Sequence, residues 1–302
     1  MPAVPTSECY AHADRLRGRV VLITGAGSGF GRATALKFTE LGAKVVLGDV
    51  DAAGLAETVK QVSAQSGPSS VVSAKCDVTS WDDQVALFET GAKAFGNIDV
   101  VLPNAGVSEI GRFDPRLDGD ASKLTKPNMK TIDIDLIGVL YTTRIALWYF
   151  INDKRADPGL RSIVFTGSMS TFYGSDGVGY GVAKAGILGI MKGIVASCND
   201  LKVRVATVCP YFSKTNILDP SFVHPYPALG YAQVSDVVNA FVAAITDPSP
   251  KTNYAAYLIP DQWGVFRMAA TGQFVGAEAA RRSKEETAAF IKADKEKAKA
   301  KL

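Results

Sequence analysis

Histidine and cysteine, the side chains that most often bind metals or form disulfides, are scarce in this sequence. Its 302 residues include two histidines and four cysteines. No two cysteines have the CxxC spacing of a zinc or redox site, so we expect no metal site. We also expect reduced thiols, as in a cytoplasmic protein, rather than a disulfide framework. The four thiols are Cys9, Cys76, Cys198 and Cys209.

The sequence also lacks a large excess of either charge and a long uncharged apolar run. With 33 basic and 30 acidic residues, its net charge of +3 gives no reason to expect nucleic acid as a partner. The most apolar helical segment, 181–198, contains Lys184 and Lys192, which a membrane span would not tolerate well. Residues 1–17 have no signal-peptide core. We therefore expect a cytoplasmic protein outside the membrane.

Short apolar runs alternate with segments of helical periodicity along most of the chain. This alternation is typical of a parallel sheet covered by helices on both faces. We expect strands at 20–23, 44–47, 71–76, 98–102, 162–165, 203–208 and 255–259. We expect helices at 31–41, 51–65, 81–95, 129–152, 180–199 and 234–245. The pattern predicts one doubly wound α/β domain of the Rossmann type.

Several stretches interrupt this rhythm, but none has the composition of a domain boundary. We expect one domain over residues 1–302, with an N-terminal arm at 1–17. The proline- and aromatic-rich stretch at 210–233 is predicted to form a substrate loop. The Lys-, Glu- and Ala-rich stretch at 276–302 is predicted to be a charged tail.

A glycine-rich turn, TGAGSGFG at residues 24–31, joins the first expected strand to the first expected helix. Glycines allow the backbone to approach a pyrophosphate closely, and the helix N-terminus offers unpaired N–H groups to the anion. A tight turn without a ligand is the alternative, but strand, turn and helix follow in the order that a dinucleotide site requires. The expected contacts are Gly25, Ser28, Gly29, Phe30 and Gly31.

Asp49 ends the second expected strand, where a carboxylate can bind both ribose hydroxyls of NAD. The same carboxylate repels the 2′-phosphate of NADP. Neither Val50 nor Ser28 is basic, so a phosphate partner is missing at both positions. The sequence therefore favours NAD over NADP, although a solvated strand-end aspartate is the alternative interpretation of Asp49.

Tyr180 and Lys184 lie four residues apart at the start of an expected helix and so share one helical face. A free tyrosine keeps its proton at neutral pH, but a nearby ammonium stabilises the phenolate and makes it a usable base. Ser168 ends the fifth expected strand, where its hydroxyl can hold a substrate oxygen against Tyr180. A turn cap is the structural alternative for Ser168, and Ser170 is a weaker rival for its role.

These motifs, in this order over about residues 18–257, resemble those of the classical short-chain dehydrogenases/reductases. The resemblance implies that Ser168, Tyr180 and Lys184 are catalytic and that the NAG motif at 104–106 steadies the central strand beside the cofactor. It also implies further cofactor contacts. These are Asp77 and Val78 at the adenine, Asn104, Ala105 and Gly106 at the central strand, and Pro210, Ser213 and Thr215 at the nicotinamide.

The resemblance further implies hydride transfer between NAD and a secondary alcohol or ketone. It implies a seven-stranded parallel sheet of order 3-2-1-4-5-6-7 and a homodimer or homotetramer built through the two long helices. Residues 209–218 and 237–245 are similar to the NAD-dependent hydroxyprostaglandin-dehydrogenase-like branch. The whole sequence also resembles oxidoreductases of fungal secondary metabolism.

The sequence departs from the family pattern at several positions. Asp135 stands where the family has a catalytic Asn, so we keep it as the fourth catalytic candidate and note that its charge can alter the surroundings of Lys184. Pro103 precedes the NAG motif. Tyr211 replaces a glycine, which predicts a bulky ring beside the nicotinamide.

The loops at the carboxyl edge of the sheet are rich in apolar side chains, which favours a bulky apolar alcohol or ketone as substrate. The candidates are Phe113, Met169, Phe172, Tyr173, Phe212, Ile217, Leu218, Phe222, Val223 and Tyr226. His224 is interpreted as an ordinary loop residue. Gly186, Gly189 and Gly193 predict close helix packing, against either a partner subunit or the sheet. Two alternative functions remain: an NADPH-dependent ketoreductase and a dinucleotide-binding protein without catalysis.

Overall fold

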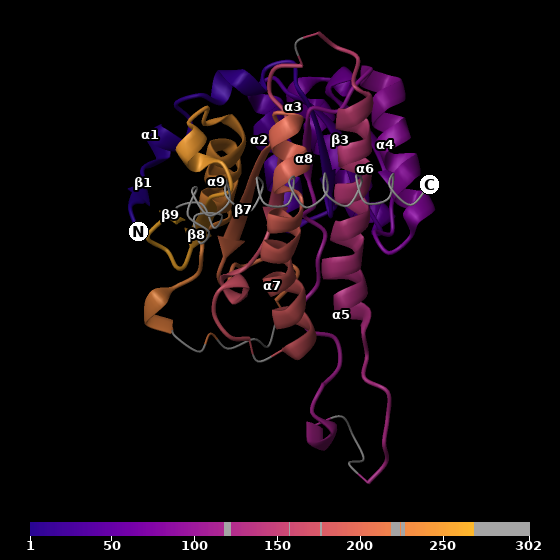
Figure 1. The fold of residues 1–302 in the computed structure, drawn as a ribbon, viewed down its shortest axis with the longest axis vertical. Helices are drawn as coiled ribbons and strands as arrows, with labels where there is room; N and C mark the ends of the chain where they lie inside the picture. Colours follow the sequence, from indigo (N-terminus) through magenta and orange to yellow (C-terminus); the bar gives the residue numbers. More distant parts are fainter. Residues whose placement is uncertain (118–121, 157, 176, 219–223, 225–226, 269–302) are drawn as a thin grey trace, which may run out of the picture.

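The computed structural model describes residues 1–268 except 118–121, 157, 176, 219–223, 225 and 226. Within that part, nine strands form one sheet in the order β1-β9-β8-β7-β6-β5-β2-β3-β4 (Figure 1). The strands are β1 Ala3–Val4, β2 Val20–Thr24, β3 Lys44–Asp49, β4 Val71–Lys75, β5 Val100–Leu102, β6 Ser162–Thr166, β7 Arg204–Pro210, β8 Ala256–Ile259 and β9 Val265–Met268.

The seven strands from β4 to β8 are parallel, and their order confirms the predicted 3-2-1-4-5-6-7. The inner strands form because their residues are buried on both faces of the sheet, as continuous apolar strands in parallel sheets are, whereas edge strand β4 alternates between buried and exposed residues. Every residue of β2 is buried. In register, Val21 of β2 lies between Val45 of β3 and Val100 of β5.

Two antiparallel strands extend the sheet beyond the prediction. β9 pairs with β8, and β1 pairs with β9 through Ala3 opposite Phe266. Residues 1–17 are therefore an integral part of the fold rather than a peripheral arm. They also form α1 Thr6–Cys9 and η1 Ala13–Leu16, in which Cys9 and Leu16 are buried. Two-residue β1 is too short to show an alternating pattern in the sequence.

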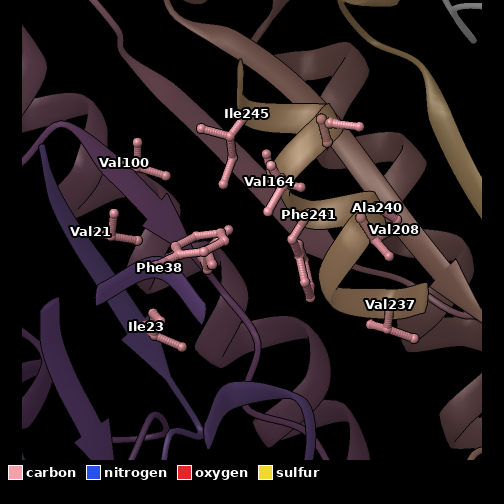
Figure 2. Close-up of a cluster of buried hydrophobic side chains, with 14 of the residues drawn as sticks. Val21, Ile23, Phe38, Val100, Val164, Val208, Val237, Ala240, Phe241 and Ile245 are labelled. Atoms are coloured by element: carbon pink, nitrogen blue, oxygen red, sulfur yellow. The ribbon is translucent and has the colours of Figure 1, made fainter. Parts of the chain in front are cut away.

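Helices cover both faces of the sheet, so the core has two layers. One face packs against α2 Gly29–Glu40, α3 Ala52–Ser66 and α9 Val234–Thr246 through Val21 and Ile23 (Figure 2). The other face packs through Val20 and Leu22 against three further helical segments. These are α4 Trp81–Phe95, α6 Gly138–Asn152 and α7 Val178–Gly193.

The two long predicted helices are each interrupted. The helix expected at 129–152 consists of α5 Lys130–Ile132, the π-helical segment η4 Asp133–Ile137 and α6. The helix expected at 180–199 begins at Val178 and divides at Ile194 into α7 and α8 Val195–Asp200. Short 3-10 turns complete the described elements. These are η2 Pro68–Ser70, η3 Pro115–Leu117, η5 Met169–Thr171, η6 Pro227–Leu229 and η7 Pro250–Thr252.

Among the described residues, one helical run is long and apolar enough to cross a membrane: Lys130–Asn152, rather than the 181–198 segment singled out above. This run packs beside α4 and α7 in the layer over the sheet (Figure 1). Its residues Val139, Ile145, Ala146 and Phe150 belong to the hydrophobic core. We therefore assign it as a core helix.

Candidate active site

The glycine turn connects β2 to α2 at the carboxyl edge of the sheet. Gly25 and Gly29 both have positive φ, which a side chain would strain. A Cβ on Gly25 would lie 2.6 Å from the backbone of Ala105, so glycine is needed for the turn to pass the NAG loop. Ser28 is extended at the N-terminus of α2. Thr215 approaches Gly29, which brings the predicted nicotinamide segment over the turn.

Asp49 lies beside the glycine turn, as the sequence predicts. One carboxylate oxygen accepts the N–H of Gly27 at 2.7 Å, and the other accepts the N–H of Asp51 at 2.9 Å. Arg32, which sequence reasoning missed, also lies beside this turn. Its guanidinium donates to the carbonyls of Gly27 and Gly54 and to the Thr58 hydroxyl. The guanidinium of Arg32 is therefore already hydrogen-bonded within the chain.

The remaining predicted adenine contacts follow β4. Asp77 accepts both the N–H and the hydroxyl proton of Thr79, and Cys76 donates its N–H to the carbonyl of Asp49. Val78 is buried against Gly138, where a Cβ would be 2.9 Å from its side chain. Val50, by contrast, is exposed at the end of β3.

Asn104 connects three strand ends. Its side-chain amide donates to the carbonyls of Thr24 and Gly25, and its side-chain oxygen accepts the Thr166 hydroxyl. The Thr24 hydroxyl in turn accepts the N–H groups of Asn104 and Ala105. These contacts hold the ends of β2, β5 and β6 together; Thr24 belongs to the glycine motif, whereas no motif indicated Thr166.

Ser168 follows β6 and is buried. It caps η5, because its hydroxyl oxygen accepts the N–H of Ser170 at 3.1 Å while its own N–H donates to Thr171. Ser168 therefore has the geometry of a turn cap, which is the structural alternative given in the sequence analysis. Accepting a hydrogen bond still leaves the Ser168 hydroxyl proton to donate, so capping is compatible with a role at a substrate oxygen.

Tyr180, Lys184 and Asp135 form a compact array. The Lys184 ammonium lies 5.5 Å from the centre of the Tyr180 ring, 3.0 Å from Asp135 Oδ2 and 3.3 Å from the Thr166 carbonyl to which it donates. Burial alone would lower the pKa of Lys184, but the charges of Asp135 and Tyr180 raise it above its usual value. Burial raises the pKa of the Asp135 carboxyl, and Lys184 opposes that effect.

The π-helical segment explains how Asp135 reaches this array. An extra residue in the turn rotates the helix, and such segments often occur at functional sites. Asp135 is fully buried, and its Oδ1 accepts the N–H of Val107 at 2.8 Å. A Cβ on Gly186 would be 2.7 Å from Leu136, so this glycine lets α7 approach the π segment. Gly186 therefore packs within the chain.

Glu109 is a second carboxylate at this site, and sequence reasoning missed it. Its oxygens accept the N–H groups of Gly179 and Tyr180 at the start of α7. It also lines a cavity of about 170 Å³ on the other side of that helix. The available sequence signal was the pair of glycines, Gly177 and Gly179, directly before Tyr180.

At the predicted nicotinamide end, Pro210 is the last residue of β7 and Ser213 is buried. Tyr211 packs against a small cluster that includes Met169 and Cys209, and its ring stacks on Phe212. His224 is not an ordinary surface loop residue. It is buried, with its ring 5.1 Å from that of Phe212 and 5.0 Å from that of Tyr231.

The apolar residues predicted around the substrate differ in burial. Met169 is buried, Phe172 is half-buried, and Phe113, Tyr173 and Ile217 are exposed. Phe113 also lines the cavity between the 109–113 segment, α5 and α7. The predicted residues Phe222, Val223 and Tyr226 lie outside the described part, as does the tail at 276–302.

The family model for short chain dehydrogenases matches residues 19–224. The chain belongs to that family. It is therefore a short-chain dehydrogenase/reductase, an NAD(P)-dependent oxidoreductase that acts on CH–OH groups. The family resemblance, the Rossmann fold and the enzyme class predicted from the sequence are confirmed.

Named relatives cover most of this short-chain dehydrogenase/reductase. The enzyme ascJ of Acremonium egyptiacum, itself named as a short-chain dehydrogenase/reductase, is 31% identical over 210 residues, 69% of this chain and 68% of that protein. The 5′-hydroxyaverantin dehydrogenase of Dothistroma septosporum is 31% identical over 219 residues, 68% of this chain and 70% of that protein. The crystal structure of levodione reductase matches with a TM-score of 0.67 and 27% identity, over 81% of this chain and 96% of that one.

Proposed function

We propose that this enzyme interconverts a bulky apolar secondary alcohol and its ketone with NAD, using Tyr180 as the acid and base. The observation that carries the proposal is the array in which half-buried Tyr180 lies against the buried Lys184–Asp135 pair, at the carboxyl edge of the sheet. Ligands of open α/β sheets bind at this edge. A protein that had lost catalysis would have no need to keep two buried, mutually dependent charges there.

The residues have distinct proposed roles. Ser168 donates its hydroxyl proton to the substrate oxygen and orients it. Tyr180 takes the proton of the alcohol during oxidation and returns it to the carbonyl oxygen during reduction. Lys184 stabilises the phenolate of Tyr180 across the 5.5 Å that separates its ammonium from the ring. Asp135 fixes Lys184 and balances part of its charge.

The chain fits a dinucleotide. α2 begins directly after Ser28, and the N-terminus of a helix is a ready site for a pyrophosphate. Bound NAD supplies the acceptor or donor of the hydride. Asp49 would bind the adenosine ribose and Lys184 the nicotinamide ribose. Thr215, beside Gly29, would hold the carboxamide.

NAD is proposed over NADP because of the charges beside β3. Asp49 and Asp51 place two carboxylates near the ribose position, and the guanidinium of Arg32 is bound to backbone carbonyls. The alternative, NADPH-dependent ketone reduction, requires Arg32 to leave those carbonyls for a phosphate. One relative is named as a 5′-hydroxyaverantin dehydrogenase and one solved structure as a levodione reductase. The family therefore contains enzymes named for either direction of the reaction.

We propose a homodimer through the long helices. Leu140, Trp148 and Ile151 of α6 and Val178 and Val182 of α7 are large apolar side chains that are exposed in the single chain. A second copy would cover them symmetrically. Cytoplasmic location is proposed because all four cysteines are free and buried rather than paired.

The test of the acid/base proposal is Tyr180→Phe. The variant keeps the ring and loses the only proposed proton carrier, so turnover of a secondary alcohol should fall by about 10²–10⁴-fold or more. Binding of NAD, measured by fluorescence titration, should change little. Turnover at the wild-type rate would reject Tyr180 as the acid and base.

A further inference from the structure

Glu109 contacts the catalytic helix at its first turn. Its Oε2 accepts the N–H of Tyr180 at 2.6 Å, and its Oε1 accepts the N–H of Gly179 at 3.2 Å. These are two of the N–H groups that an α-helix cannot satisfy internally at its start. A carboxylate there also interacts favourably with the positive end of the helix dipole. One of the two contacts is made to the backbone of Tyr180 itself.

Two glycines directly before Tyr180 leave room for the carboxylate of Glu109. A Cβ on Gly177 would lie 2.5 Å from Oε2 of Glu109, and a Cβ on Gly179 would lie 3.0 Å from Oε1. Neither glycine has the positive φ that would by itself explain it. Close approach of Glu109 is therefore the physical reason for both glycines.

The segment that carries Glu109 is braced against the helix that carries Asp135. The N–H of Val107 donates to Asp135, and the N–H of Ile110 donates to the Thr131 hydroxyl, which in turn donates to the Ser108 carbonyl. The residues on both sides of Glu109 are thus fixed. This segment holds α7 at Tyr180, while Asp135 holds it one turn later at Lys184.

Glu109 acts on Tyr180 through the backbone. Residues 178 and 182 lie about 200° around the helix from Tyr180 and Lys184, and Glu109 lines the cavity on that opposite side together with Val178 and Val182. A positioning role therefore fits the geometry better than direct contact with the reacting atoms.

We propose that Glu109 is a positioning residue, which fixes the first turn of α7 so that the Tyr180 hydroxyl points at the substrate oxygen. The inference rests on the proposed acid/base role of Tyr180. The charged and titratable groups around the Tyr180–Lys184 pair are Glu109 from the 104–110 segment, Asp135 from η4 and Cys209 from β7.

The experiment compares Glu109→Ala, Glu109→Gln and Gly177→Ala with wild type, using one secondary alcohol and saturating NAD. Misplacing a reacting group by about 1 Å can cost about 100-fold in rate, so we expect kcat of Glu109→Ala to fall by about 10- to 100-fold with little change in KM or in the Kd for NAD. Gly177→Ala should show the same loss because the new methyl group displaces the carboxylate. The double variant Gly177→Ala/Glu109→Ala should be no slower than Glu109→Ala alone.

Glu109→Gln separates position from charge. It keeps one acceptor for the Tyr180 N–H without the negative charge, so kcat should recover in part. Val242→Ala is the matched structural control, since Val242 is fully buried in α9, away from the site. It should lower Tm and leave kcat unchanged.

Each outcome bears on the proposal. Wild-type kcat in Glu109→Ala or Gly177→Ala, additive losses in the double variant, or no recovery of kcat in Glu109→Gln would overturn it. If Glu109→Ala does not fold, Gly177→Ala and Glu109→Gln still decide the question. An active Tyr180→Phe would reject the acid/base function itself, whereas an inactive Tyr180→Phe beside a fully active Glu109→Ala would reject only the positioning role.

Discussion

The Asp135→Asn variant tests the most unusual feature of this active site, a full negative charge against the lysine of the Tyr–Lys pair. The substitution keeps the size and the hydrogen bond that Oδ1 accepts from Val107. It removes the ion pair between Asp135 Oδ2 and the Lys184 ammonium, which lie 3.0 Å apart. If Asp135 offsets the charge of Lys184, the phenolate of Tyr180 should be more stable in the variant. Alcohol oxidation should then reach its plateau at lower pH.

The structure limits the size of this effect. Asp135 Oδ2 lies 3.0 Å from the Lys184 ammonium, which lies 5.5 Å from the centre of the Tyr180 ring. The carboxylate can therefore be no further than about 8.5 Å from that ring. At an effective dielectric constant of about 20, two unit charges at this distance interact by about 2 kcal/mol. Removing one charge should lower the midpoint of the pH–rate profile by at least about one pH unit.

The assay is the pH dependence of kcat/KM for alcohol oxidation in wild type and Asp135→Asn at constant ionic strength. Lys184→Met provides the opposite control, because loss of the ammonium should move the midpoint upward or abolish activity. An unchanged midpoint in Asp135→Asn would refute the electrostatic role of Asp135. An upward shift would also refute it, and would mean that the main task of Asp135 is to keep the buried Lys184 charged.

Three further predictions concern the rest of the chain. Asp49→Ala should reduce the preference for NAD, expected to be at least about tenfold in Kd, when both cofactors are titrated by fluorescence; an unchanged preference would exclude Asp49 as its source. Deleting residues 1–17 should cost about 3 kcal/mol or more of unfolding free energy in urea, because Leu16 and Cys9 leave the core. Hydrogen bonds from Arg155 and then Arg161 hold the pKa of Asp153 below its usual range, so this carboxylate contributes stability above its ordinary pKa and loses it as the pH falls below that value. Asp153→Asn should therefore lower the free energy of unfolding by about 1–3 kcal/mol at pH 7 and by less near pH 2, and an equal loss at both pH values would contradict this.

The centre of the sheet was predictable from the sequence because strands such as β2, β6 and β7 are buried on both faces. Runs such as residues 20–23 read as strands without tertiary information, and the glycine turn after them fixes where the sheet meets the cofactor. The family resemblance supplied the strand order. The edge of the sheet was not predictable, because β1 has two residues and β9 alternates weakly. Their pairing depends on residues from opposite parts of the chain.

The same limit applies to the site. Tyr180 and Lys184 share a helical face by spacing alone, and the structure brings them together. Glu109 was not predicted because its contact is with the backbone of Tyr180, 71 residues later, and only the two glycines before Tyr180 signal it. Asp135 was recognised by alignment to a motif, but its ion pair depends on a π-helical turn that has no established sequence signal here.

The antiparallel edge of the sheet also has consequences for how the molecule is assembled. β1 joins Ala3 and Val4 to Phe266 and Val265, so about 260 residues separate the two sides of this pairing. Closing so long a loop costs entropy that few local contacts repay before the rest of the sheet exists. The N-terminal strand, although synthesised first, can therefore dock only after β9 is in place. Until β1 docks, the hydrogen-bonding edge of β9 is open to other chains, which makes the last step of folding the one most exposed to aggregation.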